Sequence, residues 1–330
     1  MPEIRVDPLN GLRTIIAPAR AERPFAFVRP AEGLEERGED PFAAGNESLT
    51  PPELYARRAV SADQTSWLVR VFDNLYPALE EDPSESERDA KPDLFTAAPA
   101  RGAHEVIVNS RRSISSLGEL DAGELAEAVE TWRERMRVHA AAACLHLSVN
   151  EGYSAGASIP HTHAQLYALA FVPALIARER ERFAAYATRT MGGNLLADLV
   201  QEEVRRRERV VAIDEEAVLL APFASILPYQ LMIAPRRPRL RFEEPGPAGT
   251  AMLHDALARL ERVHGGGVPL NLWVRTAPRG AEQFCWRIDI VPRLSGLAGL
   301  ELGTGLHLNS VAPEQAASEL RDPPASRAGA

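Results

Sequence analysis

The feature that most constrains this fold is a strict alternation of apolar and polar residues from Cys144 to Asn150. Leu145, Leu147 and Val149 share one parity, so an extended chain places all three side chains on one face. A glycine-containing connection at 151–157 and a second extended run at 158–170 follow. This pattern predicts two strands of an antiparallel sheet joined by a short loop.

Strands and helices are mixed along the rest of the chain. A capping box at Asp121 and Glu124 predicts a helix that continues to about Ala143. Further helices are expected near 174–190, 195–208 and 248–264, and strands near 12–18, 66–72, 104–109, 209–220, 228–234, 268–275 and 284–291. Long loops are expected at 29–53 and 80–101. The mixed order with short links predicts an α+β fold with antiparallel sheet in each half.

The basic residues exclude several kinds of chemistry. Of 37 lysines and arginines, Lys91 is the sole lysine, so the chain has no Walker-type phosphate loop and no lysine placed for Schiff-base chemistry. A net charge of −9 argues against nucleic acid as a partner. Two cysteines and no apolar run of roughly 18 residues predict a cytoplasmic protein without a membrane partner.

The segment 152–166 carries the most chemistry. On a strand, His161, His163 and Gln165 point to the same face, with neighbouring members of the set about 7 Å apart. A neutral imidazole with one free nitrogen is a good nucleophile toward phosphorus. A glutamine can hydrogen-bond phosphoryl oxygens but cannot move a proton, so it would spare a covalent intermediate from base-catalysed hydrolysis.

Spacing alone leaves three interpretations of the two histidines open. They can be a metal-ligand pair, for which His146 and Cys144 on the preceding strand are the nearest further ligands. They can be a structural pair whose nitrogens are satisfied by hydrogen bonds. They can also supply a nucleophile.

Several segments together resemble the galactose-1-phosphate uridylyltransferase family of the histidine triad superfamily. The family's signature is matched position by position at Asn150, Gly156, Ser158, Pro160, His161, His163 and Gln165. Similar segments occur at 5–11, 17–24, 42–47, 71–79, 102–106, 222–229, 292–293 and 299–305. The resemblance therefore covers nearly the whole chain.

This resemblance implies two tandem histidine-triad-like domains, each an antiparallel sheet with packed helices. Residues 1–175 would form the catalytic domain and 176–322 the second domain, followed by a disordered tail at 323–330. The activity implied is a double displacement, in which His163 attacks the α-phosphorus of a nucleotide or nucleotide-sugar donor. A phosphorylated acceptor or phosphate then collects the nucleotide. The family also implies a homodimer.

The resemblance also assigns roles to other residues. Gln165 and Ser158 would hold the α-phosphoryl oxygens, and Arg20 and Arg23 would supply positive charge to the phosphates. Glu301 matches a position that reads the sugar across a dimer interface. The full set implied to bind substrate is Arg20, Arg23, Asn74, Asn150, Gly156, Ser158 and Glu301.

The chain departs from the family at its metal ligands. A structural zinc in many members uses two cysteines and a histidine, whose positions read Asp40, Ala43 and Ser113 here, together with the histidine at 161. A second metal site in some members uses histidines at positions that correspond to 285, 287 and about 275. This chain has Cys-Trp-Arg at 285–287 and an arginine at 275. We therefore predict no metal cofactor, and we expect hydrogen bonds to hold His161 as a positioning residue.

The substrate and the fate of the nucleotide stay open. A nucleotidyltransferase or nucleoside diphosphate sugar phosphorylase is the first hypothesis. A histidine triad hydrolase is the second, although such enzymes carry histidine at the position of Gln165. A catalytically inactive nucleotide-binding protein is the third, and a metalloenzyme using His146, His161 and His163 is the fourth. Leu300 departs from the family's sugar-reading pattern, so the sugar cannot be carried over.

Overall fold

The computed structural model describes residues 2–22, 39–59, 66–81, 94–95 and 97–322. Arg23 and the predicted disordered tail at 323–330 lie outside these residues, as does most of the loop expected at 80–101. No helix of the described ranges is long and apolar enough to cross a membrane.

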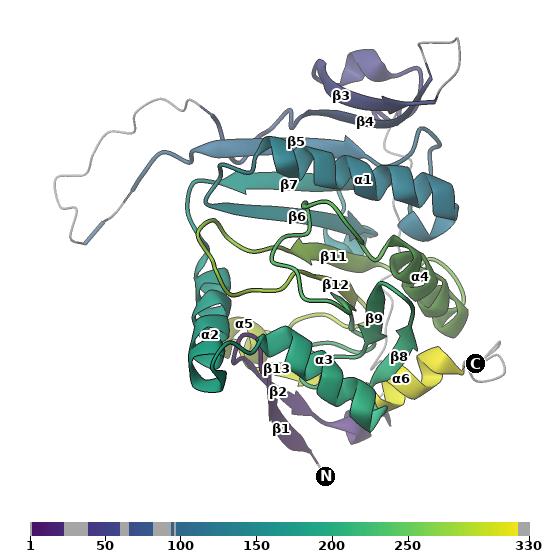
Figure 1. The fold of residues 1–330 in the computed structure, drawn as a ribbon. Coiled ribbons are helices and arrows are strands. Elements are labelled where there is room, and N and C mark those ends of the chain that lie inside the picture. Colours follow the sequence, from purple (N-terminus) through teal and green to yellow (C-terminus); the bar gives the residue numbers. More distant parts are fainter. Residues whose placement is uncertain (1, 23–38, 60–65, 82–93, 96, 323–330) are drawn as a thin grey trace.

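A ten-stranded antiparallel sheet forms the centre of the molecule (Figure 1). In order across the sheet, its strands are β3 (Glu53–Arg58), β4 (Trp67–Asp73), β5 (Gly102–Val108), β7 (His163–Leu169), β6 (Cys144–Glu151), β11 (Leu270–Arg275), β12 (Arg287–Pro292), β10 (Leu231–Pro235), β9 (Ala217–Leu220) and β8 (Val210–Ile213). The pairing of β6 with β11 joins the strands of the N-terminal half to those of the C-terminal half. The α+β expectation is confirmed, whereas the domain boundaries at 1–175 and 176–322 stay predictions.

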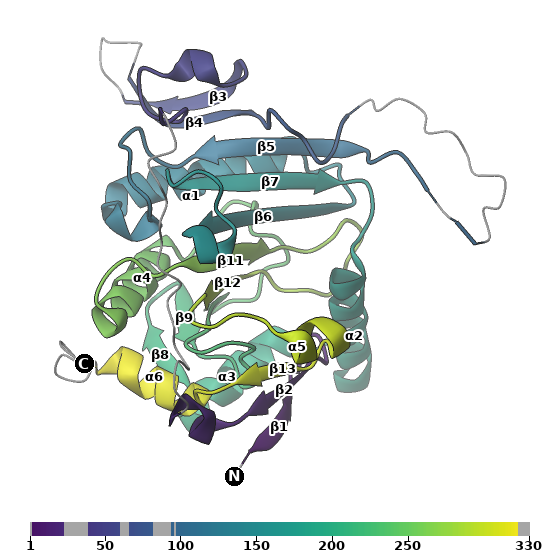
Figure 2. The same ribbon diagram turned by 180° about the vertical axis from the view of Figure 1, so that it is seen from behind.

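A three-stranded sheet lies at the other end of the molecule from β5 and β7 (Figures 1 and 2). β1 (Glu3–Val6) pairs antiparallel with β2 (Arg13–Ile16), and β13 (His307–Asn309) pairs parallel with β2. The short helix α5 (Gly299–Thr304) precedes β13. Segments from near the two ends of the chain are therefore hydrogen-bonded to each other.

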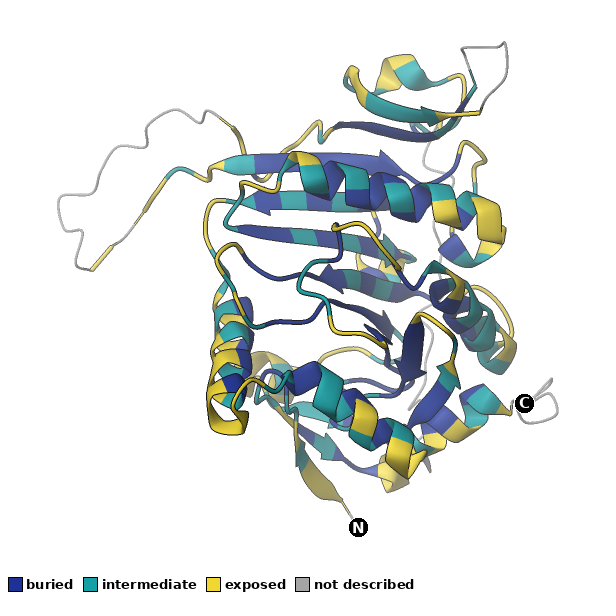
Figure 3. Ribbon diagram, viewed as in Figure 1, coloured by how far each residue is buried: buried dark blue, intermediate teal, exposed yellow. Residues whose placement is uncertain are grey.

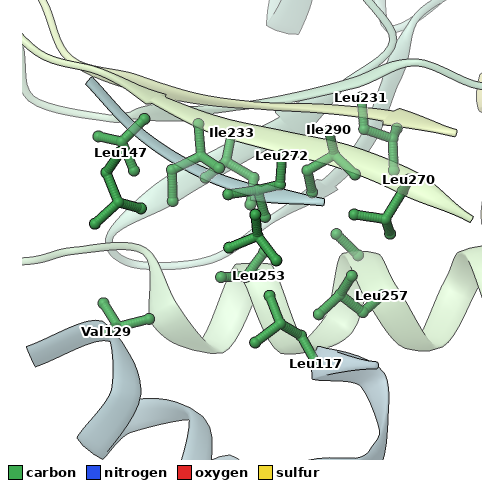
Figure 4. Packing of buried hydrophobic residues seen from close by; sticks show 14 of the residues in the cluster. Leu117, Val129, Leu147, Leu231, Ile233, Leu253, Leu257, Leu270, Leu272 and Ile290 are labelled. Atoms are coloured by element: carbon green, nitrogen blue, oxygen red, sulfur yellow. The ribbon is translucent and has the colours of Figure 1, made fainter. Parts of the chain in front are cut away.

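Helices cover the two faces of the large sheet differently. On one face pack α1 (Ala122–Val138), α4 (Thr250–His264) and α6 (Pro313–Arg321). Figures 3 and 4 show the buried layer between them and the strands, in which Leu253 and Leu257 of α4 meet Leu147 and Ile290 of the sheet. Each fully buried side chain of this kind stabilises the fold by about 1.5–3 kcal/mol. The alternating apolar side chains of 145–149 point into this layer, as the alternation predicts.

On the opposite face, Phe42 packs against Trp67, Phe72 and Val106 in the N-terminal half of the sheet, and helices cover the C-terminal half. There α2 (Ala174–Thr190) and α3 (Leu195–Arg206) pack against β8, β9 and β10 through a second apolar cluster that includes Phe183, Leu196 and Met232. In the N-terminal half, the polar side chains that alternate along β6 and β7 lie on the same face. That half therefore leaves polar side chains available for chemistry.

Some predicted elements end elsewhere. The strand expected at 158–170 begins at His163, because Pro160 has no N–H to donate to a neighbouring strand. The strand expected at 209–220 is the hairpin of β8 and β9, and the helix expected to reach Ala143 ends at Val138. The strands β1, β3 and β13 and the helices α5 and α6 were not predicted.

Candidate functional site

His163 stands at the start of β7 and is 6% exposed. Its Nδ1 lies 2.8 Å from the carbonyl oxygen of His161, and a carbonyl can only accept, so Nδ1 carries the proton. Nε2 is then left with a lone pair. Burial lowers the pKa of His163, which favours this neutral form at neutral pH. The ring has the protonation state that a nucleophile needs.

His161 is held from both sides of its ring. Nε2 lies 2.7 Å from the carbonyl oxygen of Ser110, and Nδ1 lies 2.8 Å from Oδ2 of Asp40. Although burial acts in the opposite direction, hydrogen bonds from Ser113 and His161 keep the pKa of Asp40 below its ordinary value. The Asp40 carboxylate and the Ser110 carbonyl therefore fix the orientation of the His161 ring from both sides.

The residues at the family's zinc positions do not fit a zinc ion. Zinc needs three or four nitrogen, sulfur or carboxylate ligands, but Ala43 offers none and both nitrogens of His161 are used. Ser113 Oγ instead donates to Asp40 Oδ2 at 2.5 Å. Within the described ranges, no group of three or more histidines, cysteines, aspartates and glutamates is placed to hold a metal. The lack of a metal cofactor stays a prediction.

Cations occupy the positions of the family's second metal site. Arg287 Nη2 lies 3.0 Å from Oε1 of Glu179, and its Nε lies 2.9 Å from Oδ2 of Asp289. Arg275 Nε lies 3.3 Å from the other oxygen of Glu179. All four side chains are buried, and a guanidinium cannot act as a ligand, so this cluster does not fit a metal either.

The connection between β6 and β7 leads directly into His163. Gly152 and Gly156 have φ angles of 79° and 88°, which L side chains rarely adopt, and a Cβ at Gly156 would meet open space. Ser158 is exposed on the same connection. Small residues here allow a phosphate to approach the backbone N–H groups.

Two residues that sequence reasoning missed brace this loop. Asn271 Nδ2 donates to Asn150 Oδ1 and to the carbonyl of Ala155, each at 2.7 Å. Arg293 Nη1 in turn donates to Asn271 Oδ1 at 3.0 Å. Asn150 is thus linked to the loop through Asn271, and the guanidinium group of Arg293 lies two hydrogen bonds away from it. Arg293 belongs to a segment that resembles the family, which is the only signal the sequence offered.

A buried carboxyl group supports the loop from the other face. Glu151 accepts hydrogen bonds from the backbone of Leu117 at 2.6 Å and from the hydroxyls of Ser116 and Thr162 at 3.0 Å. Burial raises the pKa of Glu151 to about 7. Because Thr162 lies between the two histidines, this carboxyl group helps to set the position of both.

Gln165 and Asn74 meet through a third histidine. Gln165 lies two residues beyond His163 on the same face, and its Oε1 is 2.9 Å from Nε2 of His104 on β5. Asn74 follows β4, and its Nδ2 is 3.2 Å from the same ring nitrogen. His104 and Tyr167 share this face by strand register, which strand pairing could have revealed.

Two predicted site residues lie away from this group. Arg20 is exposed in the short 3-10 helix Pro18–Glu22, directly after β2, and Glu301 lies in α5. The Glu301 carboxylate accepts from the backbone of Ala298 at 2.9 Å. Both elements belong to the end of the molecule that carries the small sheet, far from β7 in Figures 1 and 2. One chain therefore does not bring them to His163.

The additional metal ligands considered for the histidine pair are also displaced. His146 lies opposite Tyr167 on β7, four residues along the strand from His163. At about 3.3 Å per residue, this places it roughly 13 Å away along the strand. Cys144 is two residues further. The metalloenzyme hypothesis therefore lacks a third ligand among these candidates.

Comparisons with known proteins agree on one family. The family model for the galactose-1-phosphate uridyl transferase N-terminal domain matches residues 1–173. The ADP-glucose phosphorylase of Arabidopsis thaliana is 28% identical over 97% of this chain and 93% of its own, and the galactose-1-phosphate uridylyltransferase of Haemophilus influenzae is 30% identical over 71% and 66%. A crystal structure of an Arabidopsis thaliana ADP-glucose phosphorylase with bound ADP-glucose superimposes with a TM-score of 0.80 at 26% identity, covering 98% of this chain and 99% of that one.

Proposed function

Because this chain belongs to the galactose-1-phosphate uridylyltransferase family, we propose that it transfers a nucleoside monophosphate through a covalent bond to His163. The chain is a nucleotidyltransferase that acts between a nucleotide sugar and a phosphate or sugar phosphate. The observation that supports the covalent step is the fixed ring of His163, whose Nδ1–H donates a hydrogen bond to the His161 carbonyl. The lone pair on Nε2 of the same ring is the group that would attack the phosphorus.

The reaction balances in two displacements. In the first, Nε2 of His163 forms a bond to the α-phosphorus while the bond from that phosphorus to the bridging oxygen breaks, and the sugar phosphate leaves with the electron pair. In the second, an oxygen of phosphate or of another sugar phosphate attacks the same phosphorus and the phosphorus–nitrogen bond breaks. Nδ1 keeps its proton throughout, and the carbonyl of His161 stabilises the cationic ring of the intermediate.

The neighbouring residues have distinct roles in this proposal. Gln165, Ser158 and the backbone around Gly156 hold phosphoryl oxygens, and Asn150 and Asn74 contact the nucleotide. His161 does not touch the phosphorus, and its bond to Asp40 fixes the carbonyl that orients His163. A glutamine at 165 cannot deprotonate water, which protects the intermediate until the acceptor arrives.

Inorganic phosphate is the acceptor that we propose first. The likeness to ADP-glucose phosphorylase extends over nearly all of both chains, which supports phosphorolysis of a nucleotide sugar. The sugar and base stay open within that class.

We further propose that the enzyme is a homodimer. Arg20 and Glu301 lie at the opposite end of the chain from His163, so they can serve a phosphate and a sugar only if a second copy presents them. We also propose catalysis without a metal cofactor, supported by the hydrogen bonds that use both nitrogens of His161. The buried free thiols of Cys144 and Cys285 support a reducing, cytoplasmic setting.

A phosphorolysis assay tests this function. Purified enzyme is incubated with phosphate and each of a panel of nucleoside diphosphate sugars, and the release of sugar 1-phosphate is measured before and after dialysis against EDTA. We expect turnover with at least one donor, equal rates after dialysis, and none for His163→Ala. Turnover retained by His163→Ala would contradict the covalent step, and a loss on dialysis that zinc restores would contradict the metal-free site.

A further inference from the structure

The side-chain oxygen of Gln165 receives two donors from its own face of the sheet. The hydroxyl of Tyr167 donates to Oε1 at 2.7 Å, and Nε2 of His104 lies 2.9 Å from the same oxygen. His104 and Tyr167 are partners across β5 and β7, and their rings stack with centroids 4.2 Å apart. Two donors fill the two lone pairs of a carbonyl oxygen.

A backbone amide settles which nitrogen of His104 carries the proton. The N–H of Ala78 points at Nδ1 of His104 at 3.1 Å, and an amide N–H can only donate. Nδ1 therefore holds the lone pair, and Nε2 carries the proton that it donates to Gln165. Burial lowers the pKa of His104, which maintains this neutral ring. Nδ2 of Asn74 also lies 3.2 Å from Nε2, a longer distance than the 2.9 Å from Nε2 to Oε1 of Gln165.

The other end of the Gln165 amide is available. Among the residues that the structure describes, none accepts a hydrogen bond from its amide nitrogen, and the side chain is partly exposed. A flipped amide would turn its oxygen toward the anionic phosphoryl oxygens and its NH2 group toward two donors. Both ends would then face groups of the wrong kind.

We infer that His104 and Tyr167 are positioning residues, which fix the amide of Gln165 so that its NH2 group faces the reacting phosphate. The inference rests on the proposed function, since it requires a phosphoryl group beside His163. Neither residue touches the substrate in this account. Their effect on catalysis passes through one amide, so it should disappear when that amide is removed.

A double-mutant cycle tests this dependence. Tyr167→Phe deletes one hydroxyl and keeps the ring that stacks on His104. We expect it to slow single-turnover formation of the nucleotidyl enzyme about tenfold, the effect of losing one hydrogen bond. In a Gln165→Ala background, the same substitution should cause no further loss. Tyr186→Phe is the matched control, because its hydroxyl donates to Asp198 on α3, outside the site.

A second pair of variants tests the histidine. His104→Ala removes the donor to Oε1, whereas His104→Gln retains a side chain that can present an N–H group to it. We expect the loss in His104→Ala to exceed that in His104→Gln, with both thermal transitions close to that of wild type. A role confined to packing would instead move the two rates together with the transition temperatures.

The outcomes separate this inference from the proposed function. If the wild type forms an adduct while Tyr167→Phe keeps the wild-type rate, or loses the same factor with and without Gln165, the positioning role is wrong and the covalent mechanism stands. If the wild type forms no adduct with any donor of the panel, the proposed function and this inference fall together.

Discussion

Two polar clusters of this molecule stand where the family resemblance places metal ligands, and they are built on different principles. Around His161, the Asp40 carboxylate and the Ser110 carbonyl hold a single ring, and the Ser113 hydroxyl donates to that carboxylate. Asp40 keeps 25% of its side-chain surface exposed. Around Arg287, two guanidinium groups and two carboxylates are buried together. The first holds the residue whose carbonyl accepts from His163, and the second joins α2 to β11 and β12.

The difference concerns what each cluster must do. A metal ion supplies both charge and fixed geometry. In the Arg287 cluster, guanidinium groups supply the positive charge that a metal ion would supply. The ion pairs are almost fully removed from water and stabilise one another. The His161 cluster supplies the fixed geometry, because the His161 carbonyl has to stay within hydrogen-bond distance of Nδ1 of His163. Substitutions in the first should therefore change stability, and substitutions in the second should change rate.

The largest expected effect follows removal of Arg287. Arg287→Met leaves Glu179 and Asp289 buried without their main cation, so the free energy of unfolding should fall by about 3–5 kcal/mol in urea titrations. The matched control Arg205→Met interrupts an exposed pair with Glu202 and should leave stability nearly unchanged, since water screens that pair. A small change in the free energy of unfolding of Arg287→Met would show that the ion pairs between α2, β11 and β12 do not stabilise the fold as proposed.

Removal of Asp40 should act mainly on rate. In Asp40→Ala, His161 loses the partner of Nδ1, and we expect nucleotidyl-enzyme formation to slow by about 10–100-fold, as for other residues that orient a catalytic group. Asp40→Asn keeps an oxygen and an NH2 group at this position and should recover most of the rate. Equal losses in both variants would show that the negative charge, rather than the geometry, is what His161 requires.

Glu151 gives a smaller effect that depends on pH. Among the residues that the structure describes, no cation pairs with its carboxyl group, in contrast to Glu179. Its folded pKa of about 7 lies above the ordinary value of 4.5. The folded state therefore binds more protons between these values, so stability is lost as pH rises through this window. We expect the unfolding free energy of wild type to fall by about 2 kcal/mol from pH 5 to pH 7, relative to Glu151→Gln. Parallel pH profiles of the two proteins would contradict the raised pKa.

Local patterns made part of this structure predictable. The alternation at 144–150 and the helical spacing after Asp121 reflect burial directly, so β6 lies where it was predicted and α1 begins where it was predicted. Short elements such as β13 and α5 depend on partners that lie far away along the chain, so no local sequence pattern predicts them.

The site was predictable only where the chain itself carries the geometry. His163 and Gln165 share one parity of β7, so one strand assignment places both, and His161 lies two residues before His163 in the connection that leads into β7. His104, Asn271 and Arg293 reach the site through strand pairing and loops, which depend on the order of strands in the sheet. Arg20 and Glu301 matched the family in sequence, but the fold of one chain carries them away from His163.

The central claim is that His163 carries the nucleotide as a covalent intermediate. Its most direct test is the intact mass of the protein after brief incubation with each nucleoside diphosphate sugar in the absence of acceptor, with wild type beside His163→Ala. The account predicts a gain of one nucleoside monophosphate in the wild type alone, which also identifies the base. A wild type of unchanged mass that still releases sugar 1-phosphate, or an adduct on His163→Ala, would contradict it.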